Sequence, residues 1–335
     1  MRILLCSHWF SPSFGGVETI SKILAEEFTR AGATVTVVTN TAGPEEDLAY
    51  TVVRQPSHKT LRNLARHSDV IFQNLISLRT LVSLIPSRKP IVVTHQSWLR
   101  RTDGTRGLEN YAKLLALRAC RNVSISKAIA ESLPVDSLII GNPFEAKAFE
   151  GRRDSPRDRD IVFLGRLVSD KGCDLLLRAL AELKPRGLAP SLTVIGDGPE
   201  MSALKTLTMQ LGLETQVEFL GAMQEGRGEV VARHRIMAVP SVWAEPFGVV
   251  ALEGVASGCA LVSSSEGGLP DAVGPCGLYF PNGDVRALAS ALEQVLVDST
   301  LRANLISAGP EHLEKFQPAF IAARYLELFR GLVVS

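Results

Sequence analysis

The stretch from Glu245 to Glu253 holds two carboxylates eight residues apart, on either side of a Pro-Phe-Gly break. Pro246 biases Glu245 toward an extended backbone, and Gly248 frees the chain for a change of direction. The apolar residues from 249 onward are typical of a helix, whose first N–H groups have no partner within the helix. We therefore expect a turn that offers amides and a carboxylate to a sugar. An ordinary loop-to-helix junction with a solvated Glu253 is the alternative.

Two cations, Arg166 and Lys171, follow an apolar segment at 161–164 and are flanked by Gly165 and Gly172. Because one loop at the carboxyl end of a strand would carry both, both side chains can point toward the same ligand. A fixed guanidinium and ammonium stabilise the negative charge that develops on a departing diphosphate, without a metal ion. Two solvated surface cations are the alternative.

Glycines mark two further strand-to-helix turns. Gly15 and Gly16 follow the first apolar segment and open a helix, where backbone amides can approach a diphosphate closely. Gly196 begins the sequence Gly-Asp-Gly-Pro, with Met201 where a dinucleotide fingerprint has a third small residue. We expect a tight turn near a nucleotide at Gly196, and Met201 argues against NAD. A bare structural turn is the alternative for the double glycine.

These motifs, together with His95 at the end of an apolar segment, resemble family 4 of the glycosyltransferases in type and order. The residues that carry the likeness are Gly15-Gly16-Val17-Glu18, His95, Gly165-Arg166, Lys171-Gly172, Gly196-Asp197-Gly198-Pro199, and Glu245 with Glu253. The likeness covers nearly the whole chain and is densest from 161 to 284. Members of this family are retaining enzymes that use nucleotide sugars. Their architecture is GT-B, two facing Rossmann-like α/β domains with a central cleft.

The resemblance implies a role for each motif. Gly16 contacts the donor phosphates, His95 lies beside the donor sugar, and the departing phosphate takes the acceptor's proton on the same face. Glu245 accepts hydrogen bonds from sugar hydroxyls, and Glu253 holds the ribose. The implied catalytic residues are Arg166, Lys171, Glu245 and His95, and the donor-binding residues are Gly15, Gly16, Gly196, Phe247, Gly248, Val249 and Glu253. The family's histidine is often followed by Asp or Gly, whereas Gln96 follows here.

Short β-branched segments alternate with amphipathic ones along the chain, which predicts βαβ units and parallel sheets. We expect a helix at 16–31 with Gly32 as its C-cap. The expected strands are 3–6, 34–39, 51–54, 70–73, 91–94, 122–125, 138–140, 161–164, 191–195, 217–220, 236–239, 260–263 and 278–280. A length of 335 residues suggests two domains. We place an acceptor domain at 1–150, a donor domain at 151–315, and the linker in the charged segment 150–160. By the resemblance, a last helix at 316–335 packs back on the first domain.

Composition narrows the class of protein. Five scattered cysteines, with no Cys-x-x-Cys, predict reduced thiols in a cytoplasmic protein and neither a disulfide framework nor a zinc site. The apolar run at 3–6 is too short for a signal peptide, and no apolar run is long enough to span a membrane. Asp158-Arg159-Asp160 matches a metal-binding pattern but lies in the charged segment, so we expect no metal and no cofactor besides the nucleotide-sugar substrate.

Charge is concentrated in residues 51–130, which hold 14 lysines and arginines against three acidic residues, a net charge of +11. This excess predicts an anionic or lipid-linked acceptor, and peripheral contact with the anionic inner face of a membrane. The leucines among these arginines would form that surface: Leu61, Leu64, Leu75, Leu78, Leu81 and Leu84, with Ile71. An ordinary core strand and helix with solvated arginines is the alternative. No aromatic platform accompanies the charge, so we do not expect nucleic acid.

Two rival functions are left open. A nucleotide-sugar epimerase of GT-B architecture would use no acceptor, and a silent sugar-nucleotide-binding protein would do no chemistry. The two glutamates favour transfer of a hexose. A UDP-sugar is the expected donor on frequency alone.

Overall fold

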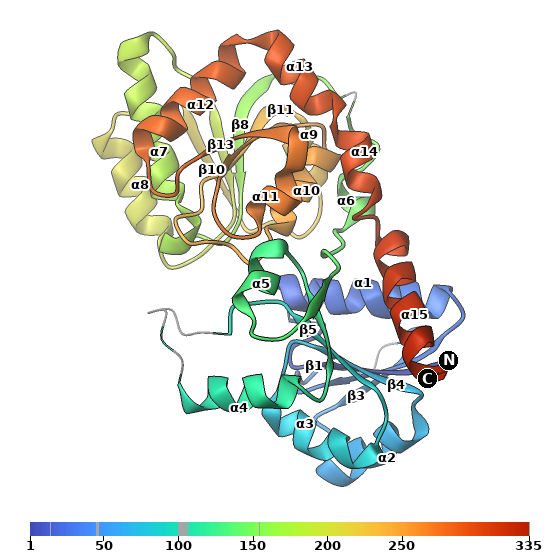
Figure 1. Cartoon of the computed structure of the whole chain (residues 1–335). Coiled ribbons are helices and arrows are strands. Elements are labelled where there is room, and N and C mark those ends of the chain that lie inside the picture. Colours follow the sequence, from blue (N-terminus) through green and yellow to red (C-terminus); the bar gives the residue numbers. More distant parts are fainter. Residues whose placement is uncertain (14, 45–46, 100–104, 106, 154, 335) are drawn as a thin grey trace. The chain divides into compact units, whose positions relative to one another are not determined.

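The computed structural model describes residues 1–13, 15–44, 47–99, 105, 107–153 and 155–334, and Val334 by its backbone alone. The chain forms two compact units, Met1–Pro143 with Phe316–Ser335, and Phe144–Lys315. Each unit contains one parallel sheet with helices on both of its faces (Figure 1). Because helices cover both faces, the central strands are mostly apolar, and polar residues gather at their carboxyl ends.

The sheet of the first unit has the strand order β3-β2-β1-β4-β5-β6-β7, and all its pairs are parallel. Its order reverses between β1 and β4, because the chain builds outward from β1 first to one side and then to the other. The strands are β1 (Arg2–Ser7), β2 (Thr34–Thr39), β3 (Thr51–Arg54), β4 (Val70–Asn74), β5 (Ile91–His95), β6 (Arg121–Ser124) and β7 (Ser137–Ile139).

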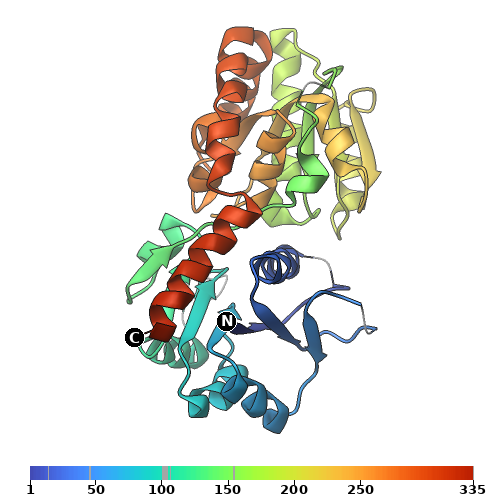
Figure 2. The same ribbon diagram turned by 90° about the vertical axis from the view of Figure 1, so that its right-hand side faces the viewer.

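Alternate residues of these strands pack on opposite helical layers. Leu4, Ile71 and Val93 belong to an apolar cluster with the helices of one face. On the other face the rings of Phe28 and Phe72 pack against the last helix of the chain, which also contacts the first helix and is drawn in red at the C-terminus in Figure 2. The helices are α1 (Gly16–Arg30), α2 (His58–His67), α3 (Leu78–Leu84), η1 (Ile85–Ser87), α4 (Leu108–Leu117), α5 (Lys127–Ser132) and α15 (Pro318–Val334).

The sheet of the second unit has the order β10-β9-β8-β11-β12-β13, again parallel throughout. Its strands are β8 (Arg159–Leu164), β9 (Leu192–Ile195), β10 (Val217–Gly221), β11 (His234–Val239), β12 (Ala260–Ser264) and β13 (Gly277–Phe280). Ile161, Phe163 and Ile236 face a core with helices α7 and α12. Gly254 of α10 packs on the opposite face, where an added Cβ would lie 2.6 Å from Met237 Sδ.

The helices of the second unit complete the βαβ alternation. They are α6 (Ala146–Phe149), η2 (Ser169–Lys171), α7 (Cys173–Leu183), η3 (Lys184–Arg186), α8 (Met201–Gln210), α9 (Arg227–Ala232), α10 (Val249–Ala256), α11 (Leu269–Val273), η4 (Gly274–Cys276), α12 (Val285–Val297), α13 (Ser299–Ser307) and α14 (Gly309–Glu314). No helix within the described residues is long and apolar enough to cross a membrane.

Every strand predicted from the sequence is present, with ends that differ by at most two residues. The prediction of a helix at 16–31 is also confirmed, since α1 ends at Arg30 and Gly32 adopts φ +84°. The predicted α/β class with two Rossmann-like units is confirmed. Period-two and period-3.6 patterns are local properties of the chain, which is why these elements were legible.

The charged segment 150–160 is not a linker, because it lies within the second unit. Arg153 donates to the carbonyls of Val255 and Ile306, at 3.0 and 2.7 Å. Arg157 donates to Ser257 O and to Ala232 O. These carbonyls lie at or near the C-terminal ends of α9, α10 and α13, which lack partners within the helix and attract cations. Charged residues are therefore partly buried here as helix caps.

Candidate functional site

The Glu245 carboxylate is held in place by two side chains of the second unit. Lys171 Nζ donates to Glu245 Oε1 at 2.6 Å, and Ser241 Oγ donates to the same oxygen. Glu245 is 9% exposed, so its carboxylate is largely shielded from water, whereas the Lys171 side chain is half-buried. Glu245 Oε2 has no partner among the described residues. One carboxylate oxygen is thus fixed by the protein, and the other is left to accept from a ligand.

Lys171 reaches Glu245 because its loop lies against the chain that follows β11. Gly172 adopts φ +66°, and a Cβ there would lie 2.0 Å from Pro240 O. Val242 N–H donates to Asp170 O at 2.9 Å, which ties the two segments together. The structure therefore brings together Lys171 and Glu245, two of the predicted site residues, from positions 74 apart in the sequence.

Arg166 lies in the same loop as Lys171 but is exposed. Its guanidinium has no partner within the described residues, so it is free to bind an anion. Gly196 packs behind this loop: it adopts φ +149°, and a Cβ there would lie 1.8 Å from Gly165 O. Leu167 N–H donates to Asp197 O at 2.9 Å. Gly196 is thus required by the contact between two strand-end loops, and its predicted contact with a donor stays a prediction.

The start of α10 offers unbonded amides next to Glu245. Gly248 caps the helix with φ +96°, and a Cβ there would lie 2.4 Å from Leu269 Cδ2. Ala251 N–H donates to Gly248 O at 2.9 Å, whereas the amides of Gly248 and Val249 have no partner among the described residues. Phe247 is 2% exposed and anchors the turn in the core. An anion is favoured at such a helix N-terminus.

Two glycines that the sequence analysis did not single out shape this turn. Gly267 forms an isolated parallel bridge with Glu245, and Gly268 N–H donates to Glu245 O at 2.6 Å. A Cβ on Gly267 would lie 2.3 Å from Glu245 O, and one on Gly268 would lie 2.1 Å from Pro246 O. The signal was a double glycine after a predicted strand, the same pattern that drew notice at Gly15 and Gly16.

Glu253 lies in the second turn of α10 and is 9% exposed. Burial raises the pKa of Glu253 to about 7; Arg227 opposes this shift, and Glu145 adds to it. Its carboxylate has no hydrogen-bond partner within the described residues. Because a desolvated carboxylate without donors is costly, this group is suited to a ligand that brings hydroxyl donors.

Arg227 and Glu145 were not predicted as site residues. They form an ion pair, and the Arg227 guanidinium lies 5.4 Å from the centre of the Phe149 ring. Arg227 Nε is buried and has no partner. No sequence motif marks these two residues, because they lie far apart in the chain. Glu145 precedes α6, and Arg227 begins α9. Their contact places a positive charge near Glu253.

The predicted residues of the first unit lie at the carboxyl edge of its own sheet. His95 ends β5 and is 1% exposed. Asn122 Nδ2 donates to the carbonyls of Leu117 and Cys120, so its Oδ1 faces His95 Nε2, which donates to it at 3.2 Å. His95 Nδ1 is then an acceptor, and it is buried without a partner. Burial lowers the pKa of His95, so this histidine is a neutral imidazole.

Gly15 and Gly16 precede and open α1, as expected. Gly15 has an extended backbone, and Thr19 N–H donates to its carbonyl at 3.1 Å. A Cβ added to Gly16 would meet no atom of the described residues within 4 Å. The packing of the chain itself therefore does not require glycine at 16, unlike at Gly196 or Gly267. A ligand that approaches the backbone there would supply the reason.

Of the seven apolar residues predicted to face lipid, four are buried in the core instead. Leu61, Ile71, Leu81 and Leu84 are at most 5% exposed and belong to the core of the first unit. The alternative, core elements with solvated arginines, is correct for these four residues, because α2 and α3 turn their apolar faces toward the sheet. Residues 100–104 and 106 of the basic segment lie outside the described residues.

The Asp158-Arg159-Asp160 pattern also has a structural role. Asp158 pairs with Arg233, and Asp160 accepts from Arg235 and from the amide of Ser191. These carboxylates are thus already paired. Among the described residues, no group of three or more His, Cys, Asp or Glu side chains is arranged to hold a metal ion.

The class of protein follows from a family model. Residues 145–312, half of the chain and nearly all of the second unit, match the family described as glycosyl transferases group 1. This chain belongs to that family, as the resemblance implied.

Individual relatives agree with this class. A D-inositol 3-phosphate glycosyltransferase of Corynebacterium aurimucosum is 36% identical over 180 residues, which are 50% of this chain and 42% of that protein. The protein of the same name from Rhodococcus erythropolis is 31% identical over 260 residues, or 65% of this chain and 58% of that protein. The chain thus spans about half the length of these relatives.

Two solved structures extend the likeness over the whole chain. HepE of Anabaena, solved with UDP and glucose, has a TM-score of 0.83 at 21% identity and covers 99% of this chain and 100% of its own. Sucrose-phosphate synthase of Thermosynechococcus elongatus has a TM-score of 0.82 at 21% identity, covering 99% of each chain. These likenesses show the fold, and the predicted GT-B fold class is confirmed.

Proposed function

We propose that this protein is a retaining glycosyltransferase, which moves a hexose from a nucleotide sugar to a hydroxyl of an acceptor. One observation carries the proposal: Glu245 is fixed through Oε1 by Lys171 and Ser241, its Oε2 has no partner among the described residues, and the unbonded amides that open α10 follow three residues later. A carboxylate oxygen accepts from sugar hydroxyls, and the amides donate to a phosphate. Sugar and diphosphate are the two halves of the donor that must be separated.

Charge stabilisation follows from the same residues. When the bond between the sugar carbon and the phosphate oxygen breaks, negative charge grows on the leaving diphosphate. The free guanidinium of Arg166 and the ammonium of Lys171 stabilise that charge without proton transfer and without a metal ion. Lys171 also orients Glu245, so it links the sugar end of the donor to the phosphate end.

Retention of configuration requires attack on the face from which the diphosphate departs. The acceptor oxygen forms a bond to the sugar carbon, and its proton passes to an oxygen of the leaving phosphate. In this route Glu245, held through Oε1 by two donors, positions the sugar, and no protein nucleophile is needed. His95 is neutral and buried, which suits a hydrogen-bonding role beside the donor sugar.

A UDP-hexose is the proposed donor. HepE, which shares this fold, was solved with UDP, with UDP and glucose, and with UDP-glucose. Glu253 supports a nucleotide donor, because a ribose would bring two hydroxyl donors to its unpartnered carboxylate. The names of the relatives, D-inositol 3-phosphate glycosyltransferase, support a cyclic polyol as the acceptor class.

The experiment is donor turnover by the full chain. UDP-, GDP- and ADP-hexoses are incubated with and without myo-inositol, inositol 3-phosphate and simple sugars, and nucleoside diphosphate release is measured. We expect release that increases with acceptor, and a product with the donor's anomeric configuration. Isomerised donor without any release identifies the epimerase, and binding without turnover identifies the silent protein. Either result overturns the proposal.

Peripheral contact with an anionic membrane is a further part of the proposal. Helix α4 exposes Leu108, Tyr111 and Leu115, at 90, 59 and 66%, and these positions share one face of the helix. The segment around α4 carries the net charge of +11, which favours an anionic lipid surface. Vesicle flotation tests this: binding should require anionic lipid and fall when Leu108 and Leu115 are replaced by serine. Equal flotation of both proteins on neutral vesicles contradicts it.

A further inference from the structure

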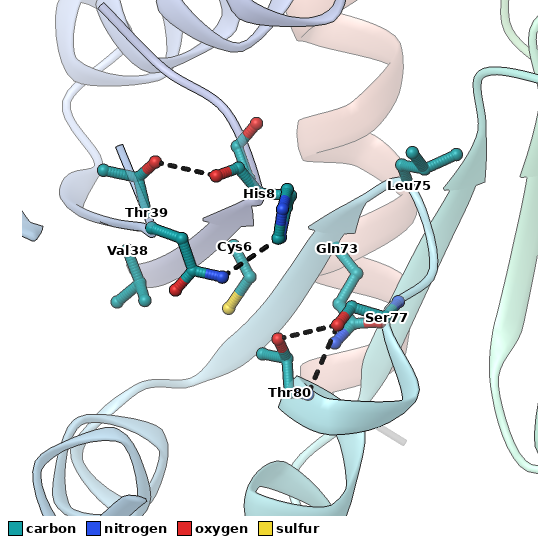
Figure 3. A pocket seen from close by; sticks show the side chains of 10 residues that line it. Cys6, His8, Val38, Thr39, Gln73, Leu75, Ser77 and Thr80 are labelled. Atoms are coloured by element: carbon teal, nitrogen blue, oxygen red, sulfur yellow. Dashed lines mark hydrogen bonds between the residues drawn. The ribbon is translucent and has the colours of Figure 1, made fainter. Parts of the chain in front are cut away.

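A small pocket lies at the carboxyl ends of three neighbouring strands of the first unit. Its lining comes from the ends of β1, β2 and β4, with the residues that follow them, and from the start of α3: Cys6, Ser7, His8, Val38, Thr39, Asn40, Gln73, Leu75, Ser77 and Thr80. The sheet order reverses between β1 and β4, and open parallel sheets bind ligands outside their strand ends at such a reversal. Figure 3 shows the side chains of His8, Gln73 and Ser77 gathered around this space.

One donor in this pocket lacks an acceptor. Gln73 is 1% exposed, and its Oε1 accepts from Ser77 N–H at 3.5 Å. The amide orientation follows, since an N–H group cannot donate to another N–H group. Gln73 Nε2 is then buried with no partner among the described residues. A buried polar group without a partner is costly, so a ligand that accepts from Gln73 Nε2 would recover free energy.

Other groups of the pocket complete the recognition of a hydroxyl. Ser77 Oγ accepts from the amide and hydroxyl of Thr80, which leaves the hydrogen of Ser77 Oγ to donate. Asn40 Nδ2 lies 3.0 Å from His8 Nδ1, and Asn40 Oδ1 has no partner among the described residues. The pocket thus offers both donors and an acceptor. A hydroxyl needs both, whereas an anionic oxygen needs donors alone.

Charge and size both argue against an anion. The lining contains no lysine or arginine, and burial raises the pKa of Cys6 to about 12, so that thiol is also neutral. The cavity volume is about 20 Å³, and one water molecule needs roughly 10–15 Å³. A single hydroxyl group fits, and a phosphate does not.

A buried amide network holds the neighbouring strand ends rigid. Gln96 Nε2 donates to Asn74 Oδ1 at 2.8 Å and to Asn142 Oδ1 at 3.0 Å, and Asn142 Nδ2 donates back to Gln96 Oε1 at 2.8 Å. Asn74 Nδ2 donates to Ser21 Oγ, which lies 2.8 Å from the hydroxyl of the pocket residue Ser7. The network joins β1, β4 and β5 to the residues after β7. Its members are uncharged amides and hydroxyls.

We infer that this pocket binds one uncharged hydroxyl of the acceptor, with Gln73 Nε2 as a donor to it. The inference rests on the proposed function only in naming the ligand as the acceptor; the pocket itself is argued from its own atoms. The inference is compatible with the anionic acceptor that we expect from the charge of the segment 51–130. A phosphate on the acceptor would be recognised outside this pocket, and the hydroxyl inside it.

Binding is tested first without any donor, on the full chain with ¹⁵N-labelled glutamine. Gln73→Leu identifies the side-chain NH₂ signals of Gln73 by their loss. We expect these signals to move on addition of myo-inositol or glycerol and to stay in place with inorganic phosphate. Signals that move with phosphate alone, or with none of these probes, overturn the inference. This result does not depend on turnover, so it is distinct from failure of the proposed function.

Turnover gives the second readout. Where a donor and acceptor pair is active, Gln73→Leu should raise the KM for the acceptor about tenfold, the loss of one neutral hydrogen bond, and leave the KM for the donor unchanged. Gln210→Leu, at an exposed glutamine of α8, is the control and should change none of these. An unchanged acceptor KM in Gln73→Leu, or equal changes in both KM values, contradicts the assignment.

Discussion

The two parallel sheets of this protein end in edges of opposite chemistry. The carboxyl edge of the second unit gathers charged groups: Lys171 holds Glu245, Arg166 is free, and Glu253 is buried beside Arg227. The carboxyl edge of the first unit gathers neutral amides, hydroxyls and a neutral histidine. Strand order and direction do not explain the difference, because both sheets are parallel and reverse their order near the middle. The difference matches what each edge is proposed to bind, a diphosphate in one case and a hydroxyl in the other.

The two edges also differ in how closely the protein packs around their glycines. In the second unit, glycines at 172, 196, 248, 267 and 268 are required because a Cβ would collide with the protein itself. In the first unit, a Cβ on Gly16 would meet nothing within 4 Å. The charged edge is therefore built by loops pressed against one another, which fix charges in place before a ligand arrives. Such preorganisation is what makes electrostatic stabilisation of a transition state effective.

The largest effect should come from the charged edge. Lys171→Ala removes the cation and leaves the Glu245 carboxylate with Ser241 alone, so kcat should fall about 10²- to 10³-fold. Arg166→Ala should lower kcat by a similar factor without changing the Tm, because Arg166 has no partner in the described structure. Lys205→Ala, at an exposed lysine of α8, is the control. Near-full turnover of Lys171→Ala in steady-state assays would remove the assigned role.

Glu253→Gln should stabilise the protein and weaken donor binding at the same time. The pKa of Glu253 is raised from 4.5 to about 7 by burial, so the folded state holds a proton that the unfolded state has released between these values. Stability therefore falls as pH rises through this window, by on the order of 3 kcal/mol. Urea unfolding should find Glu253→Gln more stable than the parent protein at pH 8 and equal to it at pH 4.

Calorimetry sharpens the same prediction. Ribose hydroxyls that donate to Glu253 favour its ionised form, so donor binding near pH 6.5 should release protons. This release appears as a dependence of the binding enthalpy on the buffer. A Glu253→Gln protein that binds UDP as tightly as the parent would place the ribose elsewhere.

Gly267→Ala should destabilise the protein by about 2–3 kcal/mol, because φ is +76° and the new Cβ would lie 2.3 Å from Glu245 O. Gly16→Ala is the matched comparison and should leave the unfolding free energy unchanged while weakening donor binding. Chemical denaturation measures the first effect, and titration with UDP measures the second. If both substitutions cost equal stability, the proposed difference between the two edges does not exist.

The smallest effect should come from the neutral edge. Gln96→Leu leaves the amides of Asn74 and Asn142 without their partner, which should cost about 1–2 kcal/mol of stability. Because the network holds the strand ends beside the acceptor pocket, the KM for the acceptor should rise more than the KM for the donor. A loss of stability with neither KM changed would limit the network to a structural role.

The elements were predictable because their signals are local. Alternation of β-branched residues gave all the strands, and the helical spacing of Val17, Ile20, Leu24 and Phe28 gave α1. The Pro-Phe-Gly break located the turn before α10, since the backbone preferences of proline and glycine act within one or two residues. The motif residues of the second unit were legible for the same reason, as each sits beside a glycine or proline that marks a turn.

The sequence by itself determined two α/β units, the order of their elements and the family of the chain. Tertiary structure alone decided that Lys171 meets Glu245 and that Gln96 meets Asn142. It also decided that Arg153 and Arg157 cap helices and that Leu61 and Leu84 belong to the core. The physical reason is that strand order sets these contacts. Residues far apart in the chain meet only when the sheet brings their strand ends together, and no local pattern encodes that distance.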